Sequence, residues 1–173
     1  ALAAVAASDA AVCLMHMQGE PGSMQAEPHY GDVVLEVAAF LDARVAQCEA
    51  AGIARRRLVL DPGFGFGKDV AQNAAMLRSF DEFAALGVPV LAGLSRKSFL
   101  GALAGQPDPV ARDAASIGAA LAAASADRAS AASLALVARS ASNLPWRAAS
   151  AAAWSARACS CASWALANAT AIS

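Results

Sequence analysis

A carboxylate, three alternating glycines and a lysine follow one another within residues 61–68. An apolar run over residues 58–60 ends at Asp61, and the glycines then lead to Lys68. We predict that the apolar run is a buried strand, so that Asp61 lies at its carboxyl end, where parallel α/β folds place their reacting groups. Glycines carry no β-carbon and let the backbone approach a ligand closely. The segment therefore indicates a binding site rather than a purely structural turn.

Two other apolar runs also end in polar residues. Residues 12–15 lead into a segment that begins at His16, and residues 88–94 lead into a segment that begins at Ser95. The three stretches CLMHMQGEPGSMQ, LDPGFGFGK and GLSRKSFLG together resemble the dihydropteroate synthase family, the pterin-condensing enzymes of folate biosynthesis. The resemblance covers residues 1 to about 122. Three motifs in the family's order and at its spacing are highly specific.

Strands alternate with helices along the chain, which indicates parallel βα units. The predicted strands are 11–17, 57–61 and 88–94, and the predicted helices are 1–8, 32–51, 72–86 and two more that begin near Phe99 and after Pro109. A complete barrel needs roughly 250 residues, and this chain has 173. With the resemblance, the prediction is an α/β fold, a partial TIM (β/α)8 barrel with about strands 5 to 7 and their helices. The family's first four strands and their early asparagine-bearing segment are then expected to be missing.

The composition changes from Ala123 onward. Alanine and serine fill 31 of the last 51 positions, glycine is absent, and all three tryptophans lie there. The resemblance predicts an Arg-x-His-Asp motif in this region, but the only histidines are His16 and His29. We therefore predict two parts, a partial barrel over 1–122 and a helical or disordered low-complexity tail over 123–173. A shifted reading frame of a GC-rich gene would explain the tail, and a genuine alanine-rich extension is the alternative.

Asp61 is the first candidate for substrate binding. An ionised carboxylate can accept two parallel N–H bonds from the amino-pyrimidinone edge of a pterin, and a buried pair of this kind rejects rings without those donors. The alternative is an aspartate that opens a turn before Pro62 and Gly63. The resemblance places Lys97 against the pterin ring, where its ammonium balances Asp61. It makes Asp61 and Lys97 the candidate catalytic residues.

The resemblance assigns further substrate contacts. Arg96 and Ser98 would hold anionic groups of the benzoate or the pyrophosphate; the alternatives are a solvated basic loop and, for Ser98, a helix cap. Phe66 would border the benzoate pocket, and Gly93 would let a ring lie against the backbone. Met15 would contact the pterin, with plain core packing as its alternative.

Four nearby features receive no assigned role in binding. Lys68 lacks the spacing of a P-loop and is expected to be a solvated loop charge. His16 lies in a Met-His-Met triplet, but neighbours in a strand point to opposite faces, so metal ligation is not expected. Phe64 is left open between core packing and stacking on a ligand. The four cysteines have no metal-finger spacing.

The resemblance implies a transferase that joins 6-hydroxymethyl-7,8-dihydropterin diphosphate to p-aminobenzoate, giving 7,8-dihydropteroate and pyrophosphate. Mg²⁺ would assist departure of the pyrophosphate, sulfonamides would compete at the benzoate site, and full-length members could form homodimers. The Mg²⁺-binding segment is expected to be absent from this chain, which is therefore expected to turn over little substrate alone. The alternatives are a module that transfers methyl groups from methyltetrahydrofolate to a corrinoid protein, and a non-functional fragment.

Charge and hydropathy favour small-molecule substrates over macromolecular partners. The formal charge of −1 gives no reason to expect nucleic acid or an anionic membrane as partner. No long uncharged apolar run predicts a membrane span, and residues 1–7 lack the basic start of a secretory signal. The cysteine usage indicates a reduced, cytoplasmic setting.

Overall fold

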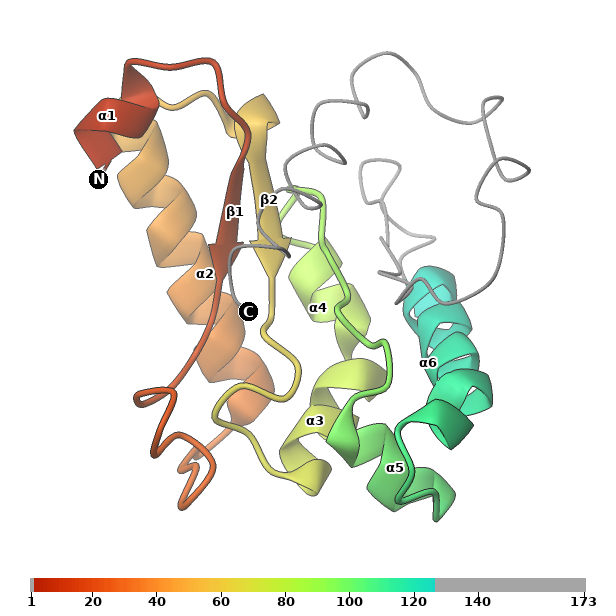
Figure 1. Cartoon of the computed structure of the whole chain (residues 1–173). Coiled ribbons are helices and arrows are strands. Elements are labelled where there is room, and N and C mark those ends of the chain that lie inside the picture. Colours follow the sequence, from red (N-terminus) through yellow and green to blue (C-terminus); the bar gives the residue numbers. More distant parts are fainter. Residues whose placement is uncertain (1, 127–173) are drawn as a thin grey trace, which may run out of the picture.

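The structure is a computed structural model that describes residues 2–126, and it shows an α/β arrangement (Figure 1). Its elements are α1 (Leu2–Ala6), β1 (Val12–Met15), α2 (Val33–Ala50), the 3₁₀ turn η1 (Arg55–Arg57), β2 (Leu58–Asp61), α3 (Val70–Arg78), α4 (Phe80–Ala84), α5 (Ser98–Ala104), the 3₁₀ turn η2 (Val110–Arg112) and α6 (Asp113–Ala126). Helix, strand, helix and strand alternate up to β2, which confirms the predicted βα units. The predicted tail beyond residue 126 lies outside the described residues.

The two strands run parallel and define the edge at which the loops meet. Val12 pairs with Leu58, and Met15 pairs with Asp61 at the carboxyl ends. The next backbone bond continues the ladder, since the His16 N–H donates to the Asp61 carbonyl at 3.0 Å. In Figure 1 both arrows point toward the loops that precede α2 and α3. Residues that follow β1 and β2 are thus delivered to one side of the molecule.

The predicted strand over 88–94 is wrong in its length. The segment lies parallel to β2, but it forms one bridge, between Val90 and Leu60. The Leu60 N–H donates to the Pro89 carbonyl, and the Leu91 N–H donates to the Leu60 carbonyl. A further hydrogen bond before this bridge would need an N–H on Pro89, and one after it would need an N–H on Pro62. Proline has no N–H. Two prolines therefore limit this neighbour of β2 to a single bridge.

The predicted helix over 32–51 is confirmed as α2, whose first turn is closed by the Asp32 side chain. That side chain accepts from the N–H groups of Val34 and Leu35, as an N-cap does. The predicted helix over 72–86 is wrong in its continuity, because Ser79 (φ −108°, ψ 39°) separates α3 from α4. The apolar spacing could not reveal this break, since it fits one helix or two.

The core lies between the strands and the helices that cover them. Leu60, Phe80 and Phe83 have no exposed surface, and Ala119 and Ala123 bring α6 onto the same cluster. Phe64 is buried as well and packs between the rings of Phe80 and Phe99, with centroids 6.3 and 6.0 Å away. Phe64 is thus a core residue. Within residues 2–126, no helix combines the length and the apolarity needed to cross a membrane.

Candidate functional site

Strand pairing places Met15 and Asp61 side by side at the carboxyl ends of β1 and β2. Laterally paired residues project from the same face of a sheet. Met15 is 41% exposed, so plain core packing, the alternative for this residue, is wrong. The Asp61 carboxylate accepts from the Gly63 N–H at 2.8 Å. One apolar and one acidic side chain therefore share the face where the loops converge.

The charge state of Asp61 reflects two opposing influences. Burial raises the pKa of the Asp61 carboxyl, while the Gly63 N–H and the cations Lys97 and Lys68 lower it. Burial also lowers the pKa of Lys97, and Asp61 opposes that shift. The charge of each side chain thus favours the ionised form of the other.

The glycine loop is shaped by the protein chain around it. Gly63 (φ +71°) and Gly65 (φ +80°) adopt left-handed conformations. A β-carbon at Gly63 would overlap the carbonyl oxygen of His16. A β-carbon at Gly65 would lie 3.3 Å from Lys97 Cδ, against the stem of that lysine. The sequence predicted that these glycines let a ligand approach the backbone. Instead, the His16 carbonyl approaches Gly63 and the Lys97 side chain approaches Gly65.

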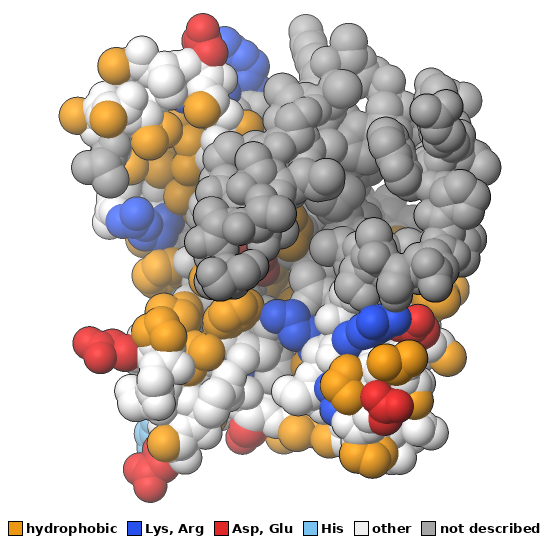
Figure 2. All heavy atoms as spheres, viewed as in Figure 1, with side chains coloured by type: hydrophobic (Ala, Val, Ile, Leu, Met, Phe, Trp, Pro, Cys, Tyr) orange, Lys and Arg blue, Asp and Glu red, His pale blue; other side chains and the backbone are white. Residues whose placement is uncertain are grey.

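Lys97 extends across this loop toward an aromatic ring. Its Nζ lies 4.4 Å from the centroid of Phe66, a cation–π distance. The stem of Lys97 lies against Gly65, and the charge of Asp61 raises the pKa of its ammonium. Lys97 thus connects Asp61, predicted for the pterin site, with Phe66, predicted for the benzoate site. On the face drawn in Figure 2, lysine and arginine side chains gather between the lower loops and the α5–α6 region.

Lys68 is buried, and its prediction as a solvated loop charge is wrong. Only 3% of its surface is exposed. Its ammonium lies 3.0 Å from each of three acceptors, the carbonyls of Gly63 and Phe66 and the Nδ1 atom of His16. The lysine therefore ties the glycine loop to the end of β1. The sequence carried no signal that Lys68 would satisfy the carbonyls of Gly63 and Phe66.

His16 is the neutral acceptor in this arrangement. It is 7% exposed, and its ring meets the Phe40 ring edge-on at 4.9 Å. Burial, and then the charge of Lys68, lowers the pKa of His16 to about 4. Burial lowers the pKa of Lys68 to about 8. An ammonium donor and a neutral imidazole acceptor are the states that this hydrogen bond requires.

Asn73 is a further support that sequence reasoning missed. Its side-chain oxygen accepts from the Gly65 N–H at 2.8 Å, and its amide donates to the carbonyls of Lys68 and Asp69. The side chain is 1% exposed. Asparagine is a poor helix former, so its place inside α3 was the available signal.

The remaining predicted contacts lie around α5. Ser98 is the first residue of α5, and Lys97 takes the N-cap position without a side-chain bond, so the cap alternative for Ser98 is wrong. Ser98 lines an open hollow between α3 and α5, together with Gly65 and Val70. Among the described residues, Leu91 Cδ2 at 3.8 Å is the nearest neighbour of a β-carbon built on Gly93, which leaves room beside that backbone.

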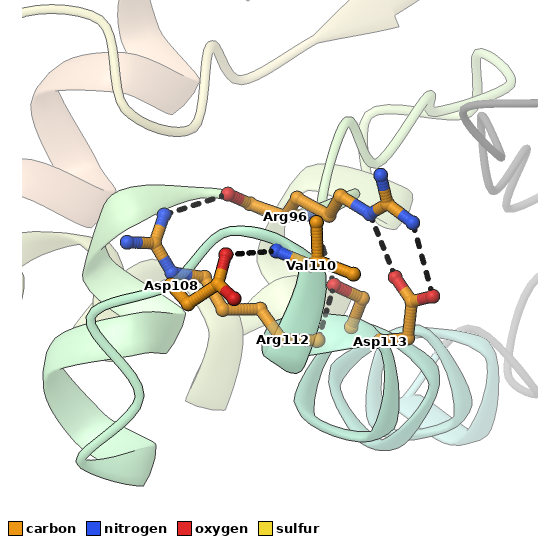
Figure 3. A network of polar contacts seen from close by, with 6 residues as sticks. Arg96, Asp108, Val110, Arg112 and Asp113 are labelled. Carbon is orange, nitrogen blue, oxygen red and sulfur yellow. Dashed lines mark hydrogen bonds and ion pairs between the residues drawn. The ribbon is translucent and has the colours of Figure 1, made fainter. Parts of the chain in front are cut away.

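Arg96 is an ion-pair partner within the chain. Its guanidinium donates to both carboxylate oxygens of Asp113, at 2.8 and 3.1 Å (Figure 3). Its side chain is 24% exposed and pairs with the more exposed carboxylate of Asp113, so the ion pair is partly solvated. The bound carboxylate raises the pKa of Arg96 further above its ordinary range.

The described residues offer no cage for a metal ion. Within residues 2–126, no three side chains of histidine, cysteine, aspartate or glutamate gather closely enough to hold one. Mg²⁺ usually binds through one or two carboxylates together with substrate phosphates, so the Mg²⁺ implied by the resemblance stays a prediction.

Comparison with known proteins identifies the family. The family model for pterin binding enzymes matches residues 1–133. Dihydropteroate synthase of Neisseria meningitidis serogroup C is 53% identical over 117 residues, which make up 67% of this chain and 41% of that protein. The Escherichia coli (strain K12) dihydropteroate synthase is 50% identical over 103 residues, or 60% of this chain and 36% of that protein.

Solved structures agree with the sequence relatives. The crystal structure of dihydropteroate synthase from Stenotrophomonas maltophilia superposes with a TM-score of 0.69 at 54% identity, over 72% of this chain and 47% of that one. The chain thus spans about two fifths of the length of the curated relatives named above, and about half of the solved barrel. By sequence and by structure, this chain belongs to the family of pterin binding enzymes and is similar to its dihydropteroate synthases.

Proposed function

We propose that this chain carries the pterin-holding part of a dihydropteroate synthase. The reaction joins 6-hydroxymethyl-7,8-dihydropterin diphosphate to p-aminobenzoate and releases pyrophosphate. The observation that supports this most directly is the position of Asp61 beside Met15 at the carboxyl ends of β2 and β1, with the Lys97 ammonium over the Phe66 ring of the adjoining loop. The proposal places β1, β2 and the segment 88–94 at about strands 5 to 7 of the barrel. This placement follows the family resemblance, and the chain covers about half of each of two solved relatives.

Asp61 would hold the substrate by its flat edge. The carboxylate already accepts one bond from Gly63, and each carboxylate oxygen has a second lone pair to offer. Two parallel N–H groups of a pterin could then bind the carboxylate as a guanidinium does. Lys97 would donate to a ring nitrogen or carbonyl on the other side of the substrate. The chain's main contribution to the reaction is then orientation and charge.

The benzoate would bind next to the pterin, along Phe66 and the ammonium of Lys97. A ring and a cation 4.4 Å apart suit a substrate that is aromatic at one end and anionic at the other. Relatives support the choice of substrates. The Xanthomonas albilineans enzyme has been solved with 4-aminobenzoic acid and with 7,8-dihydropteroate, and the Thermus thermophilus enzyme with 6HMPPP.

Isothermal calorimetry with the pterin diphosphate tests the proposal. The Asp61→Asn substitution keeps the shape but replaces one acceptor oxygen by a donor, and it should weaken binding by 2 to 3 kcal/mol, or about 30- to 150-fold. Asp42→Asn, at an exposed position of α2, is the matched control and should bind as the unsubstituted chain does. Equal affinities for all three chains would exclude Asp61 from the pterin site. Tighter binding of methyltetrahydrofolate would favour the methyl-transfer alternative.

A further inference from the structure

Arg96 has an unusual backbone conformation directly before Lys97. Its φ of +52° is the only positive value at a non-glycine residue within residues 2–126. The left-handed region costs an ordinary side chain of order 1 kcal/mol or more. Such a conformation persists only where the surrounding structure enforces it, and conformations of this kind gather at functional sites. At Arg96 this conformation is therefore expected to be held by neighbouring groups.

Both peptide groups that flank Arg96 are held by the turn that begins α6 (Figure 3). The Arg96 N–H donates to Ser116 Oγ at 2.8 Å, and Arg112 Nη1 donates to the Arg96 carbonyl at 3.1 Å. Ser116 Oγ donates in turn to the Arg112 carbonyl at 2.8 Å, so the two supports are bonded to each other. Asp113, from the same turn, holds the Arg96 side chain. Three residues within one helical turn thus fix the main chain and the side chain of Arg96.

The main-chain bonds are the ones that determine where Lys97 points. Fixing the peptide groups before and after a residue fixes its φ and ψ, and these angles set the direction of the next residue. Ser116 is 6% exposed, so its hydroxyl is a buried group committed to this bond. Arg112 is also anchored on the far side, where its Nε donates to the Gln106 carbonyl at 3.0 Å. Neither residue carries one of the substrate-binding roles assigned above.

We propose that Ser116 and Arg112 are positioning residues that hold Arg96 in its left-handed conformation and thereby aim Lys97 at Phe66 and Asp61. The role in substrate binding rests on the proposed function, while the effect on Lys97 does not. The two residues act through the backbone of Arg96, which makes their effect separable from that of its guanidinium. A residue that adopts positive φ without cost at position 96 should make the support unnecessary.

A double-mutant cycle tests this inference. Ser116→Ala should weaken binding of 6-hydroxymethyl-7,8-dihydropterin diphosphate about fivefold, the effect of one lost hydrogen bond. In an Arg96→Gly background, the same substitution should change affinity by less than about twofold, because glycine needs no support at positive φ. Ser125→Ala, on an exposed position of the same helix, is the control and should have no effect in either background. Equal losses in both backgrounds would overturn the proposal.

A ligand-free measurement separates this inference from the proposed function. The chain has two lysines, Lys68 and Lys97, so ¹³C-labelling of lysine Cε gives two assignable NMR signals. Ser116→Ala should move the titration of Lys97 toward that of an ordinary lysine and leave Lys68 unchanged; an unmoved Lys97 would contradict the proposal. If no variant binds the pterin diphosphate, the proposed function fails, and the Lys97 titration still decides the positioning role. Arg96→Asn, which also tolerates positive φ, replaces Arg96→Gly if the glycine variant does not fold.

Discussion

The charges of two lysines with different tasks act on Asp61. Lys68 is buried beneath the glycine loop and bonded to its carbonyls, whereas Lys97 crosses the loop to Phe66. Both cations favour the ionised form of Asp61, which burial alone would disfavour. An ionised carboxylate is the form that can accept two donors from one ligand. Lys68 therefore stabilises the ionised carboxylate of Asp61, whereas Lys97 is available to bind the substrate.

His16 gives this arrangement a dependence on pH. A histidine with an ordinary pKa of 6.5, lowered to about 4 in the folded chain, contributes stability that is complete above pH 6.5 and is lost as the pH falls toward 4. The loss should amount to about 2 to 3 kcal/mol. His16→Asn keeps an acceptor for Lys68 and cannot titrate, so it should remove this part of the pH dependence. Urea unfolding between pH 4 and 7 measures it.

A matched histidine provides the control for that measurement. His29 is exposed, and its backbone, rather than its ring, bonds to Gln18. His29→Asn should keep the full acid-dependent loss of stability. If His16→Asn and His29→Asn gave the same curve as the unsubstituted chain, His16 would not be the responsible group.

At the scale of elements, the loop between β2 and α3 is the most constrained segment of the site. Gly63→Ala would force a β-carbon into a left-handed residue and onto the carbonyl oxygen of His16. We expect it to lower the free energy of unfolding by more than about 2 kcal/mol. Gly22→Ala is the control, because a β-carbon there meets nothing within 4 Å and its φ is not positive. Its effect should stay within about 0.5 kcal/mol, and equal effects at both glycines would refute this account of the loop.

The sequence predicted the elements more reliably than the links between them. The apolar stripe from Val33 to Val45 and the run at 58–60 reveal α2 and β2, because burial of one face imposes a periodicity. The single bridge at Val90 depends on which N–H groups face β2, and the burial of Lys68 depends on carbonyls from a loop. The first feature is a contact between segments distant in sequence, and the second depends on the backbone geometry of a loop. The periodicity of apolar residues predicts neither.

The same distinction holds within the site. Asp61, Phe66 and Lys97 could be named because a strand, a glycine loop and a basic segment follow in a recognisable order. The supports Asn73, Arg112 and Ser116 bond to backbone atoms. Such a role is compatible with many residue types, so nothing in the sequence indicated which backbone atom each side chain would bond.

At the scale of the whole molecule, a bound pterin should stabilise the described fold as one unit. The site joins the ends of β1 and β2 to the segment before α5, so a ligand there bonds to groups that unfolding would separate. At a concentration 100 times its dissociation constant, the pterin diphosphate should add about 2.7 kcal/mol to the free energy of unfolding. Thermal and urea unfolding of the unsubstituted and Asp61→Asn chains measure this. Stabilisation of the Asp61→Asn chain by the same amount, at the same ligand concentration, would place the binding site elsewhere.

Lysine NMR during addition of the pterin diphosphate tests most directly whether Asp61 and Lys97 hold the pterin. The chain labelled at lysine Cε gives one signal for Lys97 and one for Lys68, and substitution of either lysine assigns them. We predict that the Lys97 signal shifts with saturation and that the signal of buried Lys68 moves much less. Asp61→Asn should abolish the shift at the same ligand concentration. Saturable binding that leaves Lys97 unmoved, or that persists unchanged in Asp61→Asn, would contradict it.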